Sequence, residues 1–300
     1  MSGRKKGILL AVAGAGLWGV LGVPVRILTR HGLGAVELSF IRCLAAGLFY
    51  WAFAVVTAPG KIQHSPSALT AGGLYGLLVY GGAFTAYNYS IAHIPVAVST
   101  TLMFLCPIWV LIGSWCFWGH KAGVFQLLAT LACLLGTALV SGFFSAKTMN
   151  LSALGVLAGI FNGIGVALRI LLPKYLAGKY SGETLQVYGF LGSALFLGIL
   201  SDKAGMQAAF SGGGLGEMLA ALALACLVCT LAANVMFVQS GCYISSVESS
   251  ILSSTEVVVG SLMGLLVYGE RLAPSQVCGM ALVVGGAIAS QLGRHRDGGA

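Results

Sequence analysis

Long apolar runs, separated by short polar turns, recur along the whole chain. Most runs are about twenty residues long, the length that an α-helix needs to cross the hydrocarbon core of a bilayer. Strands of an outer-membrane barrel would be about half as long and would alternate in polarity. The pattern therefore predicts an all-α polytopic membrane protein with ten transmembrane helices. The expected spans are 7–28, 35–57, 67–91, 96–118, 122–144, 151–172, 184–200, 215–240, 246–268 and 274–292.

The composition excludes a soluble domain. Hydrophobic residues make up 58% of the 300 residues and charged residues only 8%, whereas a soluble surface is about 25–35% charged. The net charge of +8 is spread between the apolar runs, so it does not form the basic face that nucleic acid requires. The eight cysteines fall within apolar runs and are interpreted as small hydrophobic residues rather than a disulfide framework.

The basic residues predict the orientation. With the N-terminus in the cytoplasm, nine Lys and Arg residues lie on that side and five on the other, while Arg42 and Arg169 fall within spans. Cytoplasmic loops carry the excess of Lys and Arg. Both termini are therefore expected in the cytoplasm, and the first run, which continues to Leu28, is interpreted as a helix rather than a signal peptide.

The chain contains an internal repeat. An ungapped offset of 150 aligns residues 90–136 with 240–286, and an offset of 144 pairs Trp18 with Asn162 and Gly19 with Gly163. Two five-helix repeats are expected, 7–144 and 151–292, followed by a cytoplasmic tail at 293–300. Because five is odd, the second repeat is inverted in the membrane, and the substrate site is expected near the midplane between the halves.

Several short motifs resemble a known family. They are Trp18-Gly19, Arg42, Pro107, Glu256, the turn Gly269-Glu270-Arg271-Leu272, Gly279 and Gly285-Gly286. They resemble the paired EamA units of the drug/metabolite transporter superfamily, and most resemble the YddG-type bacterial amino-acid exporters. The resemblance implies a ten-helix exporter in the bacterial inner membrane, with helices 1, 3, 4, 6, 8 and 9 around a central cavity. Val257 departs from the pattern because a proline matching Pro107 is usual there, which puts a kink in the ninth helix in doubt.

Two residues within spans are candidates for moving parts. Pro107 cannot donate a hydrogen bond to the carbonyl of Met103, so it is the candidate hinge or kink, with a tolerated packing kink as the alternative. Glu256 lies about ten residues into its span, where an ionisable group is costly unless it is paired or neutral. It is a possible coupling site for protons or a contact for a substrate amine, and a structural hydrogen-bonded Glu is the alternative.

The remaining charged residues within or near spans have structural interpretations. Arg169 is expected to extend its head group to the cytoplasmic interface. Arg42 is expected to pair with Glu37, with a substrate carboxylate as the alternative. Three other glutamates, Glu37, Glu183 and Glu217, are expected at helix starts.

Aromatic, amide and hydroxyl groups near mid-membrane are the candidate substrate-binding residues. Such groups suit an amphipathic solute, because aromatic faces receive apolar or cationic parts and amides or hydroxyls meet its charged ends. Helix packing and interhelical hydrogen bonds are the alternative for each. The candidates are Trp18, Tyr80, Phe84, Asn88, Phe104, Asn162, Asn234, Ser253 and Ser254, with Tyr87 nearby. Glycine ridges such as Gly155, Gly159 and Gly163 are expected to pack helices within a monomer, with dimerisation as the alternative.

The sequence lacks the motifs of other functional classes. It has no phosphate-binding G-x-x-x-x-G-K-[ST] loop, no constellation of catalytic residues and no metal-ligand spacing, so neither a cofactor nor a metal is expected. The predicted function is a secondary transporter that exports small amphipathic metabolites, foremost neutral and aromatic amino acids, by alternating access. The alternatives are export of drug-like or other small metabolites, a passive channel, and a membrane enzyme of unrecognised chemistry. The expected partners are the small-molecule substrate and membrane lipids, without nucleic acid.

Overall fold

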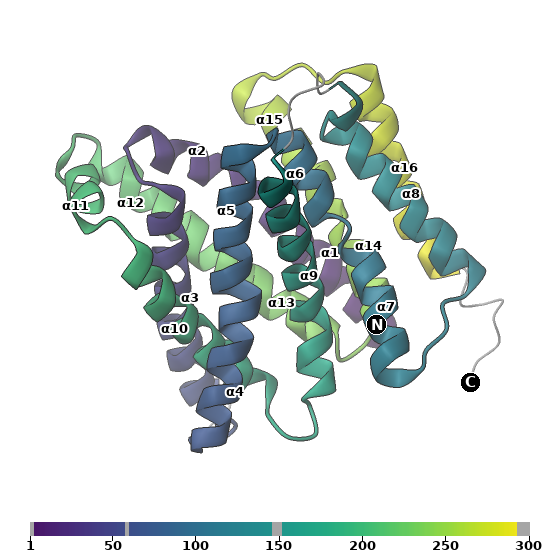
Figure 1. Cartoon of the computed structure of the whole chain (residues 1–300), viewed down its shortest axis with the longest axis horizontal. Helices are drawn as coiled ribbons and strands as arrows, with labels where there is room; N and C mark the ends of the chain where they lie inside the picture. Colours follow the sequence, from purple (N-terminus) through teal and green to yellow (C-terminus); the bar gives the residue numbers. More distant parts are fainter. Residues whose placement is uncertain (1–2, 58–59, 146–151, 293–300) are drawn as a thin grey trace.

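The computed structural model describes residues 3–57, 60–145 and 152–292, and these are helical apart from turns and loops (Figure 1). The predicted tail 293–300 lies outside the described residues. The helices are α1 Gly3–Val20, α2 Gly22–Arg30, α3 Ala35–Thr57, α4 Pro66–Gly76, η1 Leu77–Gly82, α5 Ala83–His93, α6 Val96–Met103, α7 Cys106–Trp118, α8 Val124–Val140, η2 Phe143–Ser145, α9 Ala153–Tyr175, α10 Gly182–Leu200, α11 Lys203–Ser211, α12 Leu215–Ala223, η3 Leu224–Ala232, α13 Ala233–Ser240, α14 Ser246–Ser253, α15 Thr255–Tyr268 and α16 Pro274–Leu292.

Eight helical segments in the described part of the chain are long and apolar enough to cross a membrane. They are Gly3–Arg30, Ala35–Thr57, Pro66–His93, Val96–Trp118, Ala153–Tyr175, Gly182–Leu200, Leu215–Ser240 and Ser246–Tyr268. The helices α8 and α16, with 17 and 19 residues, occupy the other two predicted spans. The short α11 was not predicted, and it lies in the loop after α10. The chain is therefore a multi-pass membrane protein.

Two helices end in matched glycine turns. Gly119 ends α7 with a φ of 64°, and Gly269 ends α15 with a φ of 66°. This left-handed conformation is readily adopted by glycine because it has no Cβ. The two turns are 150 positions apart, which agrees with the predicted alignment of the halves.

Two helices are interrupted at matched positions. Residues 104 and 105 separate α6 from α7, immediately before Cys106 and Pro107, and Ser254 separates α14 from α15. The second break has no proline. Two hydroxyl side chains beside it bond to the backbone instead. The Ser253 hydroxyl donates to the Ser250 carbonyl at 2.7 Å, and the Thr255 hydroxyl donates to the Leu252 carbonyl at 2.7 Å. Such bonds compete with the helical hydrogen bonds. The helix of the first half is therefore interrupted next to a proline, and that of the second half next to hydroxyl side chains.

A π-helical turn interrupts the third long helix of each half. One turn is η1, which contains Tyr80, and the other is η3, which contains Thr230 at the matching position. The π-helix is rare and frequently occurs at functional sites. Neither turn was predicted, because hydropathy does not distinguish π from α.

Helices α8 and α16 lie side by side at one edge of the molecule (Figure 1). A Cβ on Gly136 would lie 2.6 Å from the Gly279 carbonyl oxygen, and one on Gly279 would lie 2.6 Å from the Gly136 carbonyl oxygen. A Cβ on Gly286 would lie 2.9 Å from the Ala129 carbonyl oxygen. Since 129 matches 279 and 136 matches 286, the contacts between the two helices are reciprocal.

The contacts of α3 with α10 follow the same rule. Gly47 faces Leu191, and Gly198 faces Phe40, which are reciprocal pairs at an offset of 151. The first helix of each half packs on the other half: α1 contacts α13, α14 and α15, and α9 contacts α5, α6 and α7.

The contacts of the first helices revise the predicted alignment there. Gly7 faces Tyr243 and Ile244, whereas Gly155 faces His93 and Ile94. The faced residues match at an offset of 150, so Gly7 corresponds to Gly155 at an offset of 148. The expected offset of 144 is wrong by one helical turn, because short stretches of glycine-rich helix align almost equally well at either register. Trp18 and Asn162 are therefore not equivalent positions.

Glycines of the ridge on α9 pack within the chain. Gly155 meets Ile94, Gly159 meets Leu102, and Gly163 meets the Leu102 carbonyl oxygen. These contacts with the residue that follows α5 and with α6 agree with the packing role expected from the sequence.

Candidate functional site

An arginine of one half lies against a tryptophan of the other at the centre of the bundle. The Arg169 guanidinium carbon lies 4.0 Å from the ring centroid of Trp18 and 6.0 Å from that of Phe237. Trp18 is 5% exposed, and its ring lies 4.8 Å from that of Phe237. The expectation that Arg169 reaches the interface is wrong: the residue faces inward because an aromatic ring provides a face for its cation.

Arg42 contacts the π-helical turn η3. Its Nε donates to the Thr230 hydroxyl at 2.8 Å, and its guanidinium lies 5.4 Å from the Phe84 ring centroid. Glu37 instead accepts a hydrogen bond from the Asp202 backbone N–H at 2.7 Å. The predicted pairing of Arg42 with Glu37 is therefore wrong, because residues five apart on a helix point to different faces.

Glu256 lies in the first turn of α15, directly after the break at Ser254, and is half-buried. A Cβ on Gly19 would lie 2.6 Å from the Glu256 carbonyl oxygen, so this turn of α15 lies beside Trp18, whose ring contacts Arg169. The two inward-facing arginines are Arg169 and Arg42. Neither forms an ion pair with it, and the ion pairs of the described residues lie elsewhere. Two arginines and one glutamate thus face the interior without forming an ion pair with one another.

Several buried donors near these residues have no hydrogen-bond partner within the described chain. They are the Nδ2 atoms of Asn88 and Asn162, Nε1 of Trp109 and Nε of Arg169. They belong to α5, α7 and α9, and α5 and α7 each pack on α9. Buried donors are normally satisfied, so this region is suited to a group that supplies acceptors.

Tyr80 and Asn234 belong to a buried network that joins the halves. The Tyr80 hydroxyl donates to Gln186 Oε1 at 2.6 Å and lies 3.2 Å from Asn234 Oδ1, and Gln186 Nε2 donates to the Tyr75 hydroxyl at 3.1 Å. Phe190 stacks on the Tyr80 ring with centroids 4.3 Å apart. The side chains of this network satisfy one another's hydrogen-bonding groups, so Tyr80 and Asn234 position the surrounding helices.

The other candidate residues divide by location. Phe84 and Asn88 are half-buried on α5, and Phe84 lies next to Arg42. Phe104, Pro107, Ser253 and Ser254 are buried at the two helix breaks. The structure thus brings Trp18 together with Arg169 and Phe84 together with Arg42, and it places the break residues at the two helix interruptions.

Sequence reasoning missed the partners of these residues. Gln186, Thr230, Trp109 and Phe237 line or support the site. The signal for Gln186 was available, because a lone amide in the middle of an apolar run is costly unless it is hydrogen-bonded. The inward orientation of Arg169 had no sequence signal beyond its position.

The sequence matches the model of the EamA-like transporter family twice, at residues 5–142 and 153–290. The chain belongs to the EamA-like transporter family. The two matches begin 148 positions apart, which equals the offset between Gly7 and Gly155.

Relatives of this EamA protein include transporters. One is an "Uncharacterized transporter" of Archaeoglobus fulgidus, 27% identical over 279 residues, covering 92% of this chain and 93% of the relative. Another is the "Pseudopaline exporter CntI" of Pseudomonas aeruginosa, 30% identical over 179 residues, covering 57% of this chain and 59% of that protein. A solved crystal structure matches with a TM-score of 0.78 at 18% identity, covering 97% of this chain and 99% of the other, which shows the shared fold.

The two ends of the EamA bundle differ in their contacts. At the end that holds the N-terminus, Lys174 Nζ of α9 donates to the Ile244 carbonyl before α14 at 2.6 Å. The matching residue at the other end is Arg26, which pairs with Glu270 at 2.6 Å rather than with Ile94. The half-helices α7 and α14 also pack together, whereas α6 and α15 make no comparable contact among the described residues.

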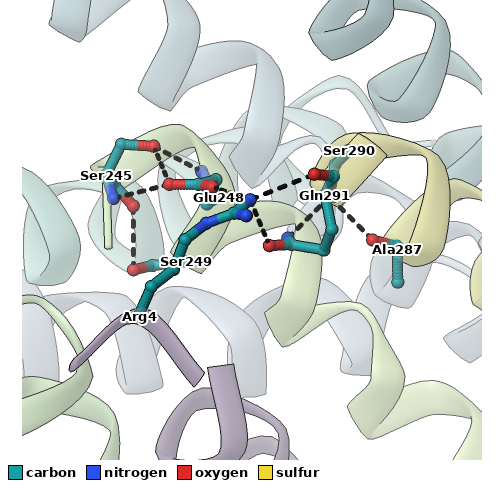
Figure 2. A network of polar contacts seen from close by, with 7 residues as sticks. All are labelled: Arg4, Ser245, Glu248, Ser249, Ala287, Ser290 and Gln291. Carbon is teal, nitrogen blue, oxygen red and sulfur yellow. Dashed lines mark hydrogen bonds and ion pairs between the residues drawn. The ribbon is translucent and has the colours of Figure 1, made fainter. Parts of the chain in front are cut away.

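A polar network ties three helices of the EamA protein at the same end as Lys174 (Figure 2). Arg4 donates to Glu248 Oε1 at 3.1 Å and to Gln291 Oε1 at 3.0 Å. The Glu248 carboxylate also accepts from the Ser245 backbone N–H at 2.9 Å. The first half has Val98 where the second has Glu248, so this network has no counterpart at the other end.

Proposed function

We propose that this EamA protein is a secondary transporter that exports small amphipathic metabolites of the amino-acid type across a bacterial inner membrane. It has ten transmembrane helices in two inverted five-helix repeats, both termini are cytoplasmic, and it works as a monomer by alternating access. The observation that carries the proposal is the position of the Arg169 guanidinium over the Trp18 ring, next to the turn of α15 that contains Glu256, in the middle of apolar helices.

Reciprocal contacts support the inverted arrangement. The pairs Gly136 with Gly279 and Ala129 with Gly286 exchange under a two-fold rotation that maps one half on the other. An odd number of crossings per half then requires the rotation axis to lie in the membrane plane. The nine-to-five bias of basic residues supports the cytoplasmic location of the termini.

The unequal ends support alternating access. Lys174 and the packed half-helices α7 and α14 close the cytoplasmic end, and their counterparts at the other end are apart. In a two-fold arrangement the second state is reached by exchanging these contacts: Arg26 moves to the Ile94 carbonyl, and Lys174 releases Ile244. The present state therefore faces away from the cytoplasm.

The charged groups support a solute with both an ammonium and a carboxylate. Arg169 offers a donor without a partner, and Glu256 offers an acceptor without an ion pair. The faces of Trp18 and Phe84 complement the apolar part of the solute. Glu256 also serves as the proposed coupling residue, because it is the carboxylate between the two arginines.

The test is counterflow in proteoliposomes preloaded with unlabelled amino acids and supplied with a labelled trace. Transient accumulation of label above equilibrium is expected, because a carrier exchanges its two faces and a channel does not. Glu256→Gln is expected to remove the dependence of transport on a pH gradient. It is also expected to raise the half-saturating substrate concentration, because the acceptor for the ammonium is weakened, while counterflow persists at saturating substrate. Equilibration without accumulation for every amino acid would overturn the transport proposal.

A further inference from the structure

The charges facing the interior are unequal. Arg42 and Arg169 supply two positive charges and Glu256 one negative charge. Arg42 bonds to Thr230, and Arg169 lies 6.0 Å from the ring of Phe237, seven residues further along the same span. A Cβ on Gly19, next to Trp18, would lie 2.6 Å from the Glu256 carbonyl oxygen. A zwitterion with one ammonium and one carboxylate satisfies Glu256 and one arginine only. The second arginine would remain unpaired in a medium of low dielectric constant, which is unfavourable.

The two arginines lie at different depths. Arg42 is seven residues from Ala35, where α3 begins at the end away from the N-terminus, and Arg169 is six residues from Tyr175, where α9 ends at the opposite side. At a rise of about 1.5 Å per residue, each is about 10 Å inside its helix end. Glu256 is in the middle of its helical pair α14–α15. The order along the bundle is thus cation, anion, cation.

The arginines are also held differently. Arg42 is fixed because its Nε donates to Thr230, which leaves its terminal nitrogens to bind a ligand. Arg169 is held by the Trp18 face and has an unpartnered Nε. A guanidinium binds carboxylate with two parallel hydrogen bonds when its nitrogens are free.

We infer that the preferred substrate carries one ammonium and two carboxylates, with the ammonium at Glu256 and one carboxylate at each of Arg42 and Arg169. This inference deepens the proposed transport function and rests on it. A solute with net charge −1 neutralises the site, whereas a neutral zwitterion leaves one positive charge. The preference is therefore for acidic solutes over the neutral and aromatic amino acids that the sequence favours.

The test compares labelled glutamate with labelled glutamine in counterflow, because the two differ by one carboxylate and are nearly equal in size. Glutamate is expected to half-saturate transport at a concentration at least about ten-fold lower. Arg42→Gln is expected to raise the half-saturating concentration of glutamate to that of glutamine. The half-saturating concentration of glutamine is expected to change by no more than about two-fold. Arg169→Gln is expected to weaken transport of both solutes. Arg30→Gln, which removes an exposed arginine of α2, is expected to weaken neither.

The outcomes separate this inference from the transport proposal. Counterflow of glutamine at least as tight as that of glutamate would overturn the dicarboxylate preference and leave transport intact. A preference for glutamate that survives Arg42→Gln would overturn the role of Arg42. Arg42→Lys retains the charge and is expected to keep most of the preference, which distinguishes lost recognition from lost folding. Absence of accumulation with both solutes would overturn this inference, whereas the transport proposal falls only if no amino acid accumulates.

Discussion

The guanidinium of Arg169 lies over the ring of Trp18, with 4.0 Å between the guanidinium carbon and the ring centroid. The two residues come from the first helices of different halves, α9 and α1. Any movement of one half against the other therefore changes the surroundings of this cation. The contact couples the candidate substrate site directly to the arrangement of the halves.

Replacement of the Trp18 ring is expected to weaken transport. A desolvated cation–π contact contributes up to about 2 kcal/mol, so Trp18→Leu should raise the half-saturating substrate concentration by about ten-fold or more. Trp115→Leu is the matched control, because Trp115 is 58% exposed on the outside of the bundle. Equal effects of both substitutions in counterflow would contradict the binding role of Trp18.

The network in Figure 2 is expected to stabilise the fold. Arg4→Gln removes the guanidinium that donates to the Glu248 carboxylate, which is 1% exposed, and to Gln291. Losing hydrogen bonds to a buried charge is costly, and with Arg4 itself one-third exposed we expect a loss of about 1–3 kcal/mol. The control is Arg26→Gln in the exposed pair with Glu270, where about 0–1 kcal/mol is expected. Thermal unfolding in detergent measures both, and equal shifts would contradict the role of burial.

Close packing of α4 on α10 predicts different effects for two glycines of α4. A Cβ on Gly76 would collide with the backbone of Gly189, whereas one on Gly73 would meet nothing within 4 Å. Gly76→Ala is expected to destabilise by about 1–3 kcal/mol because the helices must separate. Gly73→Ala is expected to be neutral or stabilising by about 0.5–1 kcal/mol because alanine favours helix. The melting temperatures of the two variants test this difference.

The bond from Lys174 to the Ile244 carbonyl predicts a local opening when it is removed. In Lys174→Met, the segment 241–246 should lose protection against amide hydrogen exchange, because the chain before α14 is no longer attached to α9. Lys179→Met provides the control, since Lys179 is exposed and its ammonium lies over the ring of Tyr180. Unchanged exchange in 241–246 after removal of Lys174 would show that the bond does not close this end.

Hydropathy was sufficient to locate the long helices, because about twenty apolar residues are needed for a span wherever they occur. The sequence also indicated Pro107, because a proline disturbs the hydrogen bonding of its own helix wherever it occurs. The orientation of Arg169 could not be predicted, because it depends on a ring supplied by a helix about 150 residues away. The break at Ser254 was hidden for a related reason: serine bonds to the backbone in many contexts and interrupts a helix in few of them.

The glycine contacts between α8 and α16 have a mechanical consequence. Where the backbones of two helices touch, as at Gly136 and Gly279, no side chain is available to change rotamer and absorb a displacement. Protein interiors of this density transmit strain rather than dissipate it. These two helices should therefore move as one rigid unit. The remaining helices must change their tilt relative to this unit while the contact between α8 and α16 stays intact.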